Sequence, residues 1–220
     1  MSENFVDSVR DSYDRVADEY ALHLFRELDG KPLDRRLLDR FIRDLPSEGE
    51  VCDMGCGPGQ IARYLRNRGA QVFGLDLSPK MVGQARALNP DIPFREGNML
   101  ALDLADASLA GIAAFYAIVN IPKTSHPQVF REMFRVLRPQ GLLLLSFHIG
   151  EQVVRERELW SRPICMDFYF LQPADVCRDL AAAGFLIQEI VERDPYAPDV
   201  EYQSRRAYIF GRKPAEHGNP

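Results

Sequence analysis

This 220-residue chain contains only four cysteines and one tryptophan. The cysteines stand at 52, 56, 165 and 177, with no second close pair and no neighbouring histidines that would complete a zinc site. We therefore expect no metal site. Reduced, mostly buried thiols are typical of a cytoplasmic protein, which is where we place the chain.

Long apolar runs and an excess of positive charge are also missing. The first eleven residues, MSENFVDSVRD, lack the apolar core of a signal peptide, and no run of 18 apolar residues could span a membrane. The 27 Lys and Arg against 32 Asp and Glu give a net charge of −5. These absences predict a protein that binds neither nucleic acid nor membrane.

The sequence does contain an alternation of helical and strand-like segments. Apolar residues recur every three to four positions over 5–20 and 33–45, which predicts two amphipathic helices. Beyond them, helical segments alternate with short apolar strands at 51–54, 70–77, 92–98, 108–117 and 141–148. This alternation predicts an α/β fold, with a parallel sheet covered by helices on both faces.

The C-terminal part differs, because strands 185–193 and 205–213 have no helical segment between them. They predict a hairpin and an antiparallel strand at one edge of the sheet. We expect a flexible tail over 214–220.

The segment VCDMGCGPGQ, residues 51–60, joins the first of these strands to a helix. Gly55, Gly57 and Gly59 permit a ligand to approach the backbone closely. Their G-x-G-x-G spacing differs from the G-x-G-x-x-G fingerprint of dinucleotide sites, and Pro58 removes one amide. A nicotinamide-dependent oxidoreductase is therefore a less favoured alternative.

Two carboxylates accompany this loop. Asp76 ends the second strand, where it could accept hydrogen bonds from both ribose hydroxyls. Asp53 ends the first strand, where it suits a ligand with a cationic end, although it could simply cap the following helix. A ribose, a close backbone and a positive group together fit S-adenosylmethionine.

Four motifs resemble those of class I S-adenosylmethionine-dependent methyltransferases, and SYDRVADEYA (12–21) resembles their lead-in helix. They are DMGCGPG (53–59), GLDLSPKMV (74–82), REGNM (95–99) and EMFRVLRPQGLLLLSF (132–147). The resemblance implies a Rossmann-like, doubly wound, seven-stranded sheet of order 3-2-1-4-5-7-6, with the last strand antiparallel. An N-terminal helical lid (1–46) would cover the cofactor-binding domain (47–213) within one structural domain.

The resemblance also implies which residues bind the cofactor. Asp76 would hold the ribose hydroxyls and Asp53 would face the ammonium. The implied set is Tyr13, Tyr20, Asp53, Gly55, Cys56, Gly57, Asp76, Leu77, Met81, Asn98, Met99 and Phe115. Alternatively, the two tyrosines belong to the core and the two methionines only fill gaps. Many family members have Asp where Asn98 stands, and Pro139-Gln140-Gly141 replaces a common Pro-Gly-Gly.

The acceptor side is less defined. His148 follows an apolar strand and is the best general-base candidate, although it could instead order the next segment. Tyr116, Trp160, Phe168, Tyr169 and Phe170 could form an aromatic wall. Arg155, Arg157 and Arg162 could meet an anionic acceptor, or could simply be solvated on a segment that covers the sheet.

We expect a methyltransferase that acts on an O, N or S atom of a small molecule. The strand end AFYAIVNIP lacks the Asn/Asp-Pro-Pro-aromatic run of enzymes that methylate amino groups of DNA bases or protein glutamine. The alternative from another class is a cofactor-binding module without catalysis. The sequence leaves the oligomeric state open.

Overall fold

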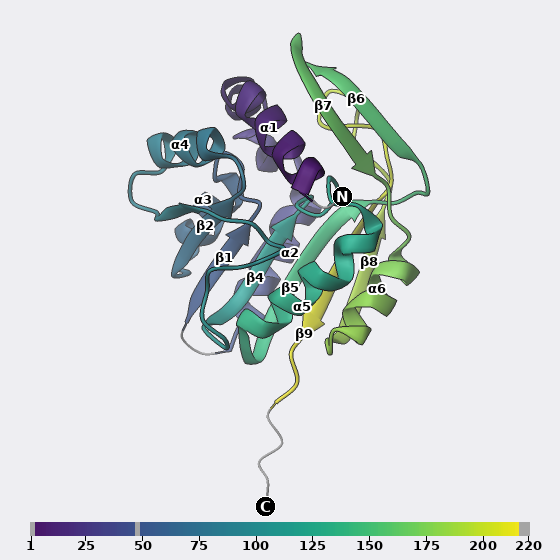
Figure 1. Cartoon of the computed structure of the whole chain (residues 1–220). Coiled ribbons are helices and arrows are strands. Elements are labelled where there is room, and N and C mark those ends of the chain that lie inside the picture. Colours follow the sequence, from purple (N-terminus) through teal and green to yellow (C-terminus); the bar gives the residue numbers. More distant parts are fainter. Residues whose placement is uncertain (1–2, 47–48, 216–220) are drawn as a thin grey trace, which may run out of the picture.

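The computed structural model describes residues 3–46 and 49–215. Its centre is a seven-stranded sheet of order β3-β2-β1-β4-β5-β9-β8 (Figure 1). The strands are β1 (Glu50–Met54), β2 (Val72–Asp76), β3 (Phe94–Glu96), β4 (Leu109–Phe115), β5 (Leu137–His148), β8 (Leu186–Arg193) and β9 (Arg206–Arg212). Strand β9 runs antiparallel to both of its neighbours, β5 and β8, whereas the other six strands all point in the same direction. This confirms the predicted strand order and the antiparallel hairpin.

Helices cover both faces of the sheet (Figure 1). They are α2 (Pro32–Asp44), α3 (Gln60–Asn67), α4 (Pro79–Leu88), α5 (His126–Val136) and α6 (Pro173–Ala182). Leu143 and Leu145 of β5 belong to the core that includes α5 and α6, whereas Leu142 and Leu144 belong to the core that includes α2 and α3. A strand buried on both faces explains why the run GLLLLSF shows no polar alternation.

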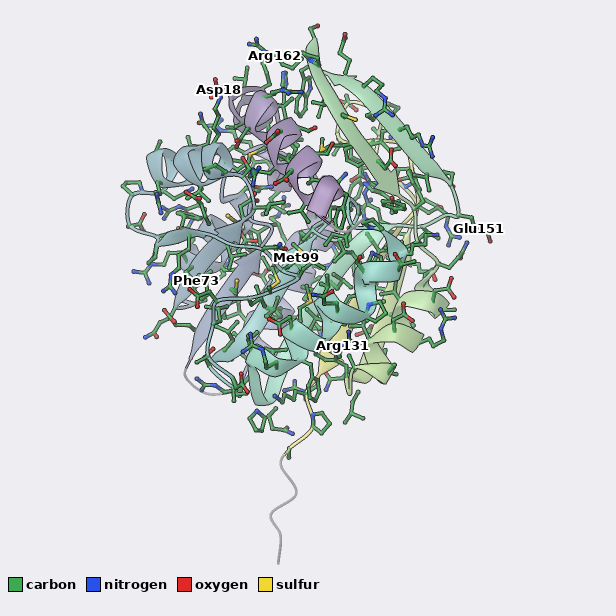
Figure 2. All side chains as sticks on the ribbon, in the orientation of Figure 1. Asp18, Phe73, Met99, Arg131, Glu151 and Arg162 are labelled. Carbon is green, nitrogen blue, oxygen red and sulfur yellow. The ribbon has the colours of Figure 1, made fainter. Side chains whose placement is uncertain are left out.

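The segment after β5 forms a separate hairpin of β6 (Val153–Leu159) and β7 (Arg162–Tyr169). Trp160 and Ser161 make its turn, both at positive φ (+48° and +60°). Figure 2 shows Arg162 at the tip of this hairpin and Glu151 beyond its other end. From the sequence this segment has no predicted secondary structure, whereas the structure shows two paired strands.

Helix α1 (Glu3–Leu24) lies between this hairpin and α4 (Figure 1). Ser8 Oγ donates to the carbonyl of Cys165 over 2.7 Å, and the Cys165 amide donates to Ser12 Oγ over 3.0 Å. These serines cover the free edge of β7. On the other side Ser78 Oγ donates to Asp14 Oδ1 over 2.5 Å. Helix α1 is thus attached to two elements on either side of the sheet's carboxyl edge.

Two expectations differ from the structure, and a third concerns residues that the structure does not describe. Strand β5 begins at Leu137 and not at the predicted residue 141, so Pro139-Gln140-Gly141 lies inside the strand. Cys165 is exposed, although Cys52 and Cys56 are buried as expected. Residues 47–48 at the proposed lid boundary, and 216–220 of the proposed tail, lie outside the described residues, so both boundaries stay predictions.

Across residues 3–46 and 49–215, no helix has the length and apolar character needed to cross a membrane. No cluster of three or more His, Cys, Asp or Glu side chains in the same ranges could hold a metal ion.

Candidate active site

A glycine loop connects β1 to α3. Gly55, Gly57 and Gly59 have φ of +71°, +50° and +85°, which L side chains rarely adopt. The Gly55 amide donates to the carbonyl of Leu75 over 2.7 Å. A Cβ at position 55 would lie 2.7 Å from Cβ of Ala117, so the segment after β4 leaves no room for a side chain there.

A cavity lies between this loop and α1, at the carboxyl ends of β1, β2 and β4. Its empty volume, including the opening to solvent, is about 740 Å³. Most of the predicted residues line it: Tyr13, Tyr20, Gly55, Gly57, Asp76, Leu77, Met81, Asn98, Met99, Phe115 and Tyr116. Sequence reasoning missed other lining residues: Phe5, Val6, Val9, Gly97, Leu100, Ala117, Asn120 and Ile121. On α1 the missed residues lie on an apolar stripe, which a core-facing helix would show equally.

Asp76 lies at the end of β2, at the edge of the cavity. Its Oδ2 accepts a hydrogen bond from the Gly57 amide over 2.8 Å, and its Oδ1 accepts one from the Ser78 amide over 2.9 Å. Burial raises the pKa of Asp76, while the two amides oppose that shift. The carboxylate therefore fixes the loop and also faces the cavity.

Asp53 and Cys56 do not line the cavity. Asp53 is buried beneath the loop, and its Oδ2 accepts a hydrogen bond from the Ala62 amide in the first turn of α3 over 2.8 Å. Burial raises the pKa of Asp53 to about 7. This geometry favours the helix cap over the predicted contact with a cofactor ammonium. Cys56 is buried in the core shared with α3, and there too the cofactor contact finds no support.

Asn120 connects the lid helix to the hairpin. The Tyr13 hydroxyl donates to Asn120 Oδ1 over 2.6 Å, and Asn120 Nδ2 donates to the carbonyl of Asp167 over 3.0 Å. Tyr13 also contacts Tyr20 edge-to-face, with ring centroids 5.9 Å apart. Both tyrosines line the cavity from α1, and their contact with a cofactor stays a prediction.

Residues 51–141, which contain the glycine loop, Asp76 and Asn98, match the methyltransferase domain family. Over these residues the chain is similar to the class I S-adenosylmethionine-dependent methyltransferases. It is 30% identical over 155 residues to a malonyl-[acyl-carrier protein] O-methyltransferase of Enterobacter lignolyticus, an alignment covering 70% of this chain and 58% of that protein. The chain thus spans less than two thirds of that relative's length.

Solved structures of methyltransferases share the fold. A methyltransferase from Methanosarcina mazei superimposes with a TM-score of 0.71 at 17% identity, over 79% of this chain and 96% of that one. The [4+2]-cyclase SpnF superimposes with a TM-score of 0.68 at 20% identity, over 94% and 95%. At these identities the likeness concerns the fold alone.

S-adenosylmethionine is the cofactor of this methyltransferase family, and the residues around the cavity fit it. Asp76 offers a carboxylate at the position suited to ribose hydroxyls, and Gly57 leaves the backbone bare opposite Tyr20. Leu77 and Met81 supply apolar surface for an adenine. At the expected adenine edge, Asn98 Oδ1 already accepts a hydrogen bond from the Leu100 amide over 2.9 Å.

His148 lies outside the cavity lining. Its ring packs against Tyr116, with centroids 4.9 Å apart, and its Nδ1 lies 2.7 Å from Ser204 Oγ. Burial, helped by nearby Arg206, lowers the pKa of His148 to about 3. Such a weak base is a poor proton acceptor at neutral pH, so this geometry argues against the predicted general base and favours the ordering role.

The predicted aromatic wall is only partly assembled. Tyr116 lines the cavity, but Trp160, Phe168, Tyr169 and Phe170 do not. Trp160 at the hairpin tip stacks on His23 (centroids 5.0 Å apart) and contacts the cavity-lining Tyr20 edge-to-face. Phe168 packs into the core, and Phe170 is buried against His148. Tyr169 faces a separate groove on the hairpin.

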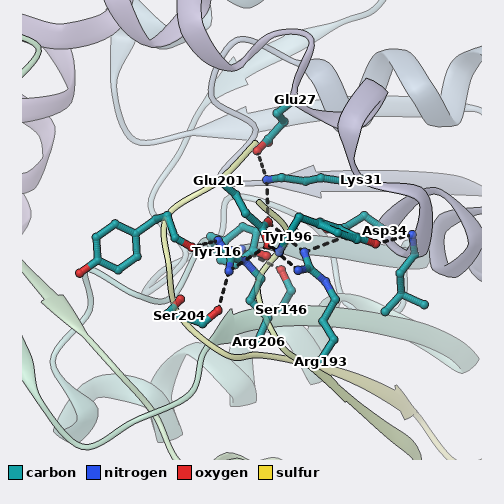
Figure 3. A network of polar contacts seen from close by, with 12 residues as sticks. Glu27, Lys31, Asp34, Tyr116, Ser146, Arg193, Tyr196, Glu201, Ser204 and Arg206 are labelled. Atoms are coloured by element: carbon teal, nitrogen blue, oxygen red, sulfur yellow. Dashed lines mark hydrogen bonds and ion pairs between the residues drawn. The ribbon is translucent and has the colours of Figure 1, made fainter. Parts of the chain in front are cut away.

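A buried ion-pair network lies behind Tyr116 (Figure 3). Arg193 Nη2 lies 3.0 Å from Glu201 Oε2 and 3.2 Å from Asp34 Oδ2, and Arg206 Nη1 lies 3.2 Å from Glu201 Oε1. The three cations, Lys31, Arg193 and Arg206, balance the three acids, Glu27, Asp34 and Glu201. The network joins the start of α2 to the β8–β9 connection and so fixes the rear wall of the site.

Proposed function

We propose that this chain transfers the methyl group of S-adenosylmethionine to a small-molecule acceptor by in-line displacement. The observation that carries the proposal is the cavity beneath α1, which joins the glycine loop and Asp76 to a largely apolar lining. The sulfonium is already a good leaving group, so the protein has to orient the nucleophile and exclude water. A lid tied down on both sides serves both tasks.

The size and setting of the cavity support a small acceptor. Helix α1 and the β6–β7 hairpin cover the sheet's carboxyl edge, which leaves a narrow space for a metabolite and none for a nucleic-acid duplex. The relative from Enterobacter lignolyticus is named as an O-methyltransferase. At least one relative of the chain is therefore named for methylation of an oxygen atom.

A cofactor-binding module without catalysis is the alternative to be tested. The test is incubation with S-adenosylmethionine labelled in its methyl group and a low-molecular-weight metabolite extract. We expect label in a new small product, together with stoichiometric S-adenosylhomocysteine. Cofactor binding without label transfer to any extract fraction would favour the non-catalytic alternative.

A further inference from the structure

Apart from Asp76, which the proposed function assigns to the ribose hydroxyls, the described residues that line the cavity offer no side chain that is deprotonated at neutral pH. Among the described residues that line it, the ionisable side chains are Asp76, Tyr13, Tyr20 and Tyr116. Both oxygens of Asp76 already accept amide hydrogens. Burial raises the pKa of each tyrosine, so all three stay protonated at neutral pH. His148 lies behind Tyr116, outside the lining.

A lining without a free general base restricts which acceptor groups can attack the methyl group. A hydroxyl, a thiol or an ammonium group must lose a proton before or during attack on the sulfonium methyl, and a positioned base normally takes it. A carboxylate is already deprotonated at neutral pH. An acid is therefore the acceptor class that this site can use without a general base.

We infer that the acceptor is an apolar carboxylic acid, methylated on its carboxylate, and that it enters through a groove between α1 and the β6–β7 hairpin. This inference rests on the proposed function. A carboxylate oxygen attacks the methyl carbon, the carbon–sulfur bond breaks, and its electron pair stays on sulfur. The products are a methyl ester and neutral S-adenosylhomocysteine, and no proton moves.

The apolar lining of the cavity suits this reaction. A carboxylate and a sulfonium carry opposite charges, and both charges disappear in the products. Phe5, Val9, Met99, Phe115 and Ile121 provide a low-dielectric environment that strengthens the attraction between the two ions. Loss of water from the carboxylate also makes its charge easier to neutralise than in bulk solvent.

The entry groove adjoins the cavity directly. Phe5, Val9 and Asn120 line both the cavity and the groove, so these three residues form the wall that the two spaces share beneath the first turns of α1. Figure 1 shows this end of α1 beside the end of β7. The outer part of the groove combines apolar side chains with two arginines of β6: Pro122, Met166, Tyr169, Arg155 and Arg157.

The two arginines give the groove its charge. Arg155 Nε lies 3.8 Å from Asp167 Oδ1, and its side chain stays 72% exposed. Arg157 contacts Cys165 Sγ and the carbonyl of Glu156, and among the described residues it makes no ion pair with a carboxylate. Asp167 is the one acid of the described groove lining. The groove therefore carries a net positive charge over an apolar floor, which complements an amphipathic anion.

The test compares matched probes on the protein saturated with S-adenosylhomocysteine. Octanoate, octan-1-ol and octylamine share one apolar chain and differ in the head group. Calorimetry should show octanoate binding more tightly than the other two, and turnover with S-adenosylmethionine should yield methyl octanoate. Tighter binding of the alcohol or the amine, or their methylation in place of octanoate, would overturn the inference.

A pair of variants separates the groove from general charge effects. Arg155→Gln with Arg157→Gln should weaken octanoate binding roughly three- to tenfold, as expected for two exposed charges, and leave octanol binding unchanged. The control pair, Arg131→Gln with Arg178→Gln, lies on α5 and α6, away from the groove (Arg131 in Figure 2), and should bind octanoate like the wild type. Equal octanoate affinity in the groove variant and the wild type would contradict the assigned entry.

The same titrations distinguish failure of the proposed function from failure of the assigned acceptor. If the wild-type protein does not bind S-adenosylhomocysteine, the proposed function itself is overturned. Normal S-adenosylhomocysteine binding with no preference for octanoate would overturn only the assigned acceptor and its route.

Discussion

The Gly57 amide donates a hydrogen bond to Asp76 Oδ2 over 2.8 Å, which ties the glycine loop to the end of β2. The same carboxylate lines the cavity, where we propose that it binds the ribose hydroxyls of the cofactor. Asp76→Ala should weaken S-adenosylhomocysteine binding by about 1.5–3 kcal/mol, because charge-assisted hydrogen bonds are lost. Calorimetry measures this, with Asp103→Ala, an exposed acid, as the control. Unchanged affinity in a folded Asp76→Ala variant would refute the assigned role.

The glycines of the loop should differ in what they tolerate. A Cβ at position 57 would meet nothing closer than Tyr20 Cε1 at 3.6 Å, whereas one at position 55 would lie 2.7 Å from Cβ of Ala117. Gly57→Ala should therefore fold with a loss of about 1–2 kcal/mol from its left-handed backbone. Gly55→Ala should lose roughly 2–4 kcal/mol, because the overlap adds to the same strain. Chemical denaturation of both variants tests this order.

Gly57→Ala should also lose affinity for the cofactor, since its methyl group would project toward Tyr20 inside the cavity. A stable Gly57→Ala variant that binds S-adenosylhomocysteine like the wild type would place the ligand elsewhere.

Asp53 should make stability fall as the pH rises. Its pKa is about 7 in the folded protein, and in the unfolded chain about 3.9 is usual, so between these values the folded state holds the extra proton. The unfolding free energy of the wild type relative to Asp53→Asn should therefore decrease, by on the order of 3 kcal/mol, from pH 4.5 to 7.5. Urea denaturation of both proteins at the two pH values gives this difference. A constant difference would show that Asp53 does not titrate in this range.

His148 should act in the opposite sense. Its pKa is about 3 in the folded protein and about 6.5 in the unfolded chain, so between these values the unfolded state holds the extra proton. The stability of the wild type relative to His148→Gln should decline as the pH falls from 6.5 toward 4.5, by roughly 2–3 kcal/mol. Parallel stability profiles of the two proteins would contradict the low pKa.

The same variant decides whether His148 takes part in catalysis. Loss of a general base lowers turnover by about 10²–10⁴-fold. Because His148 packs behind Tyr116 and stays neutral, we expect His148→Gln to keep turnover within about fivefold of the wild type and to keep S-adenosylhomocysteine affinity. A hundredfold loss of turnover with normal cofactor affinity would restore His148 as the base.

The strand order came from the family resemblance, whereas the antiparallel hairpin followed from the sequence because the last two strands lack a helix between them. The sequence did not predict the β6–β7 hairpin. Its turn residues, Trp160 and Ser161, both have positive φ, a geometry that usually selects Asn-Gly, so the sequence at this position carries no recognisable turn signature. The early start of β5 was also not predicted. Pro139 suggested that the strand begins after it, yet Leu137 already pairs with Leu109 of β4.

The sequence predicted those parts of the site that a local motif encodes. It did not predict contacts between residues that are far apart in the sequence. The glycine spacing and Asp76 located the cavity. Asp53 was ambiguous, because an acid that caps a helix and one that faces a cation look alike in one dimension. The ion pair of Arg193 with Glu201 and Asp34 joins three separate segments, so no local pattern could reveal it.

The most direct test of the central claim is a calorimetric titration of the purified protein with S-adenosylmethionine, S-adenosylhomocysteine and NADH. The cavity, with its G-x-G-x-G loop and Asp76, predicts roughly micromolar binding of both adenosyl ligands and none of NADH. Absence of adenosyl binding, or a preference for NADH, would contradict the assignment of the cavity and with it the proposed methyl transfer.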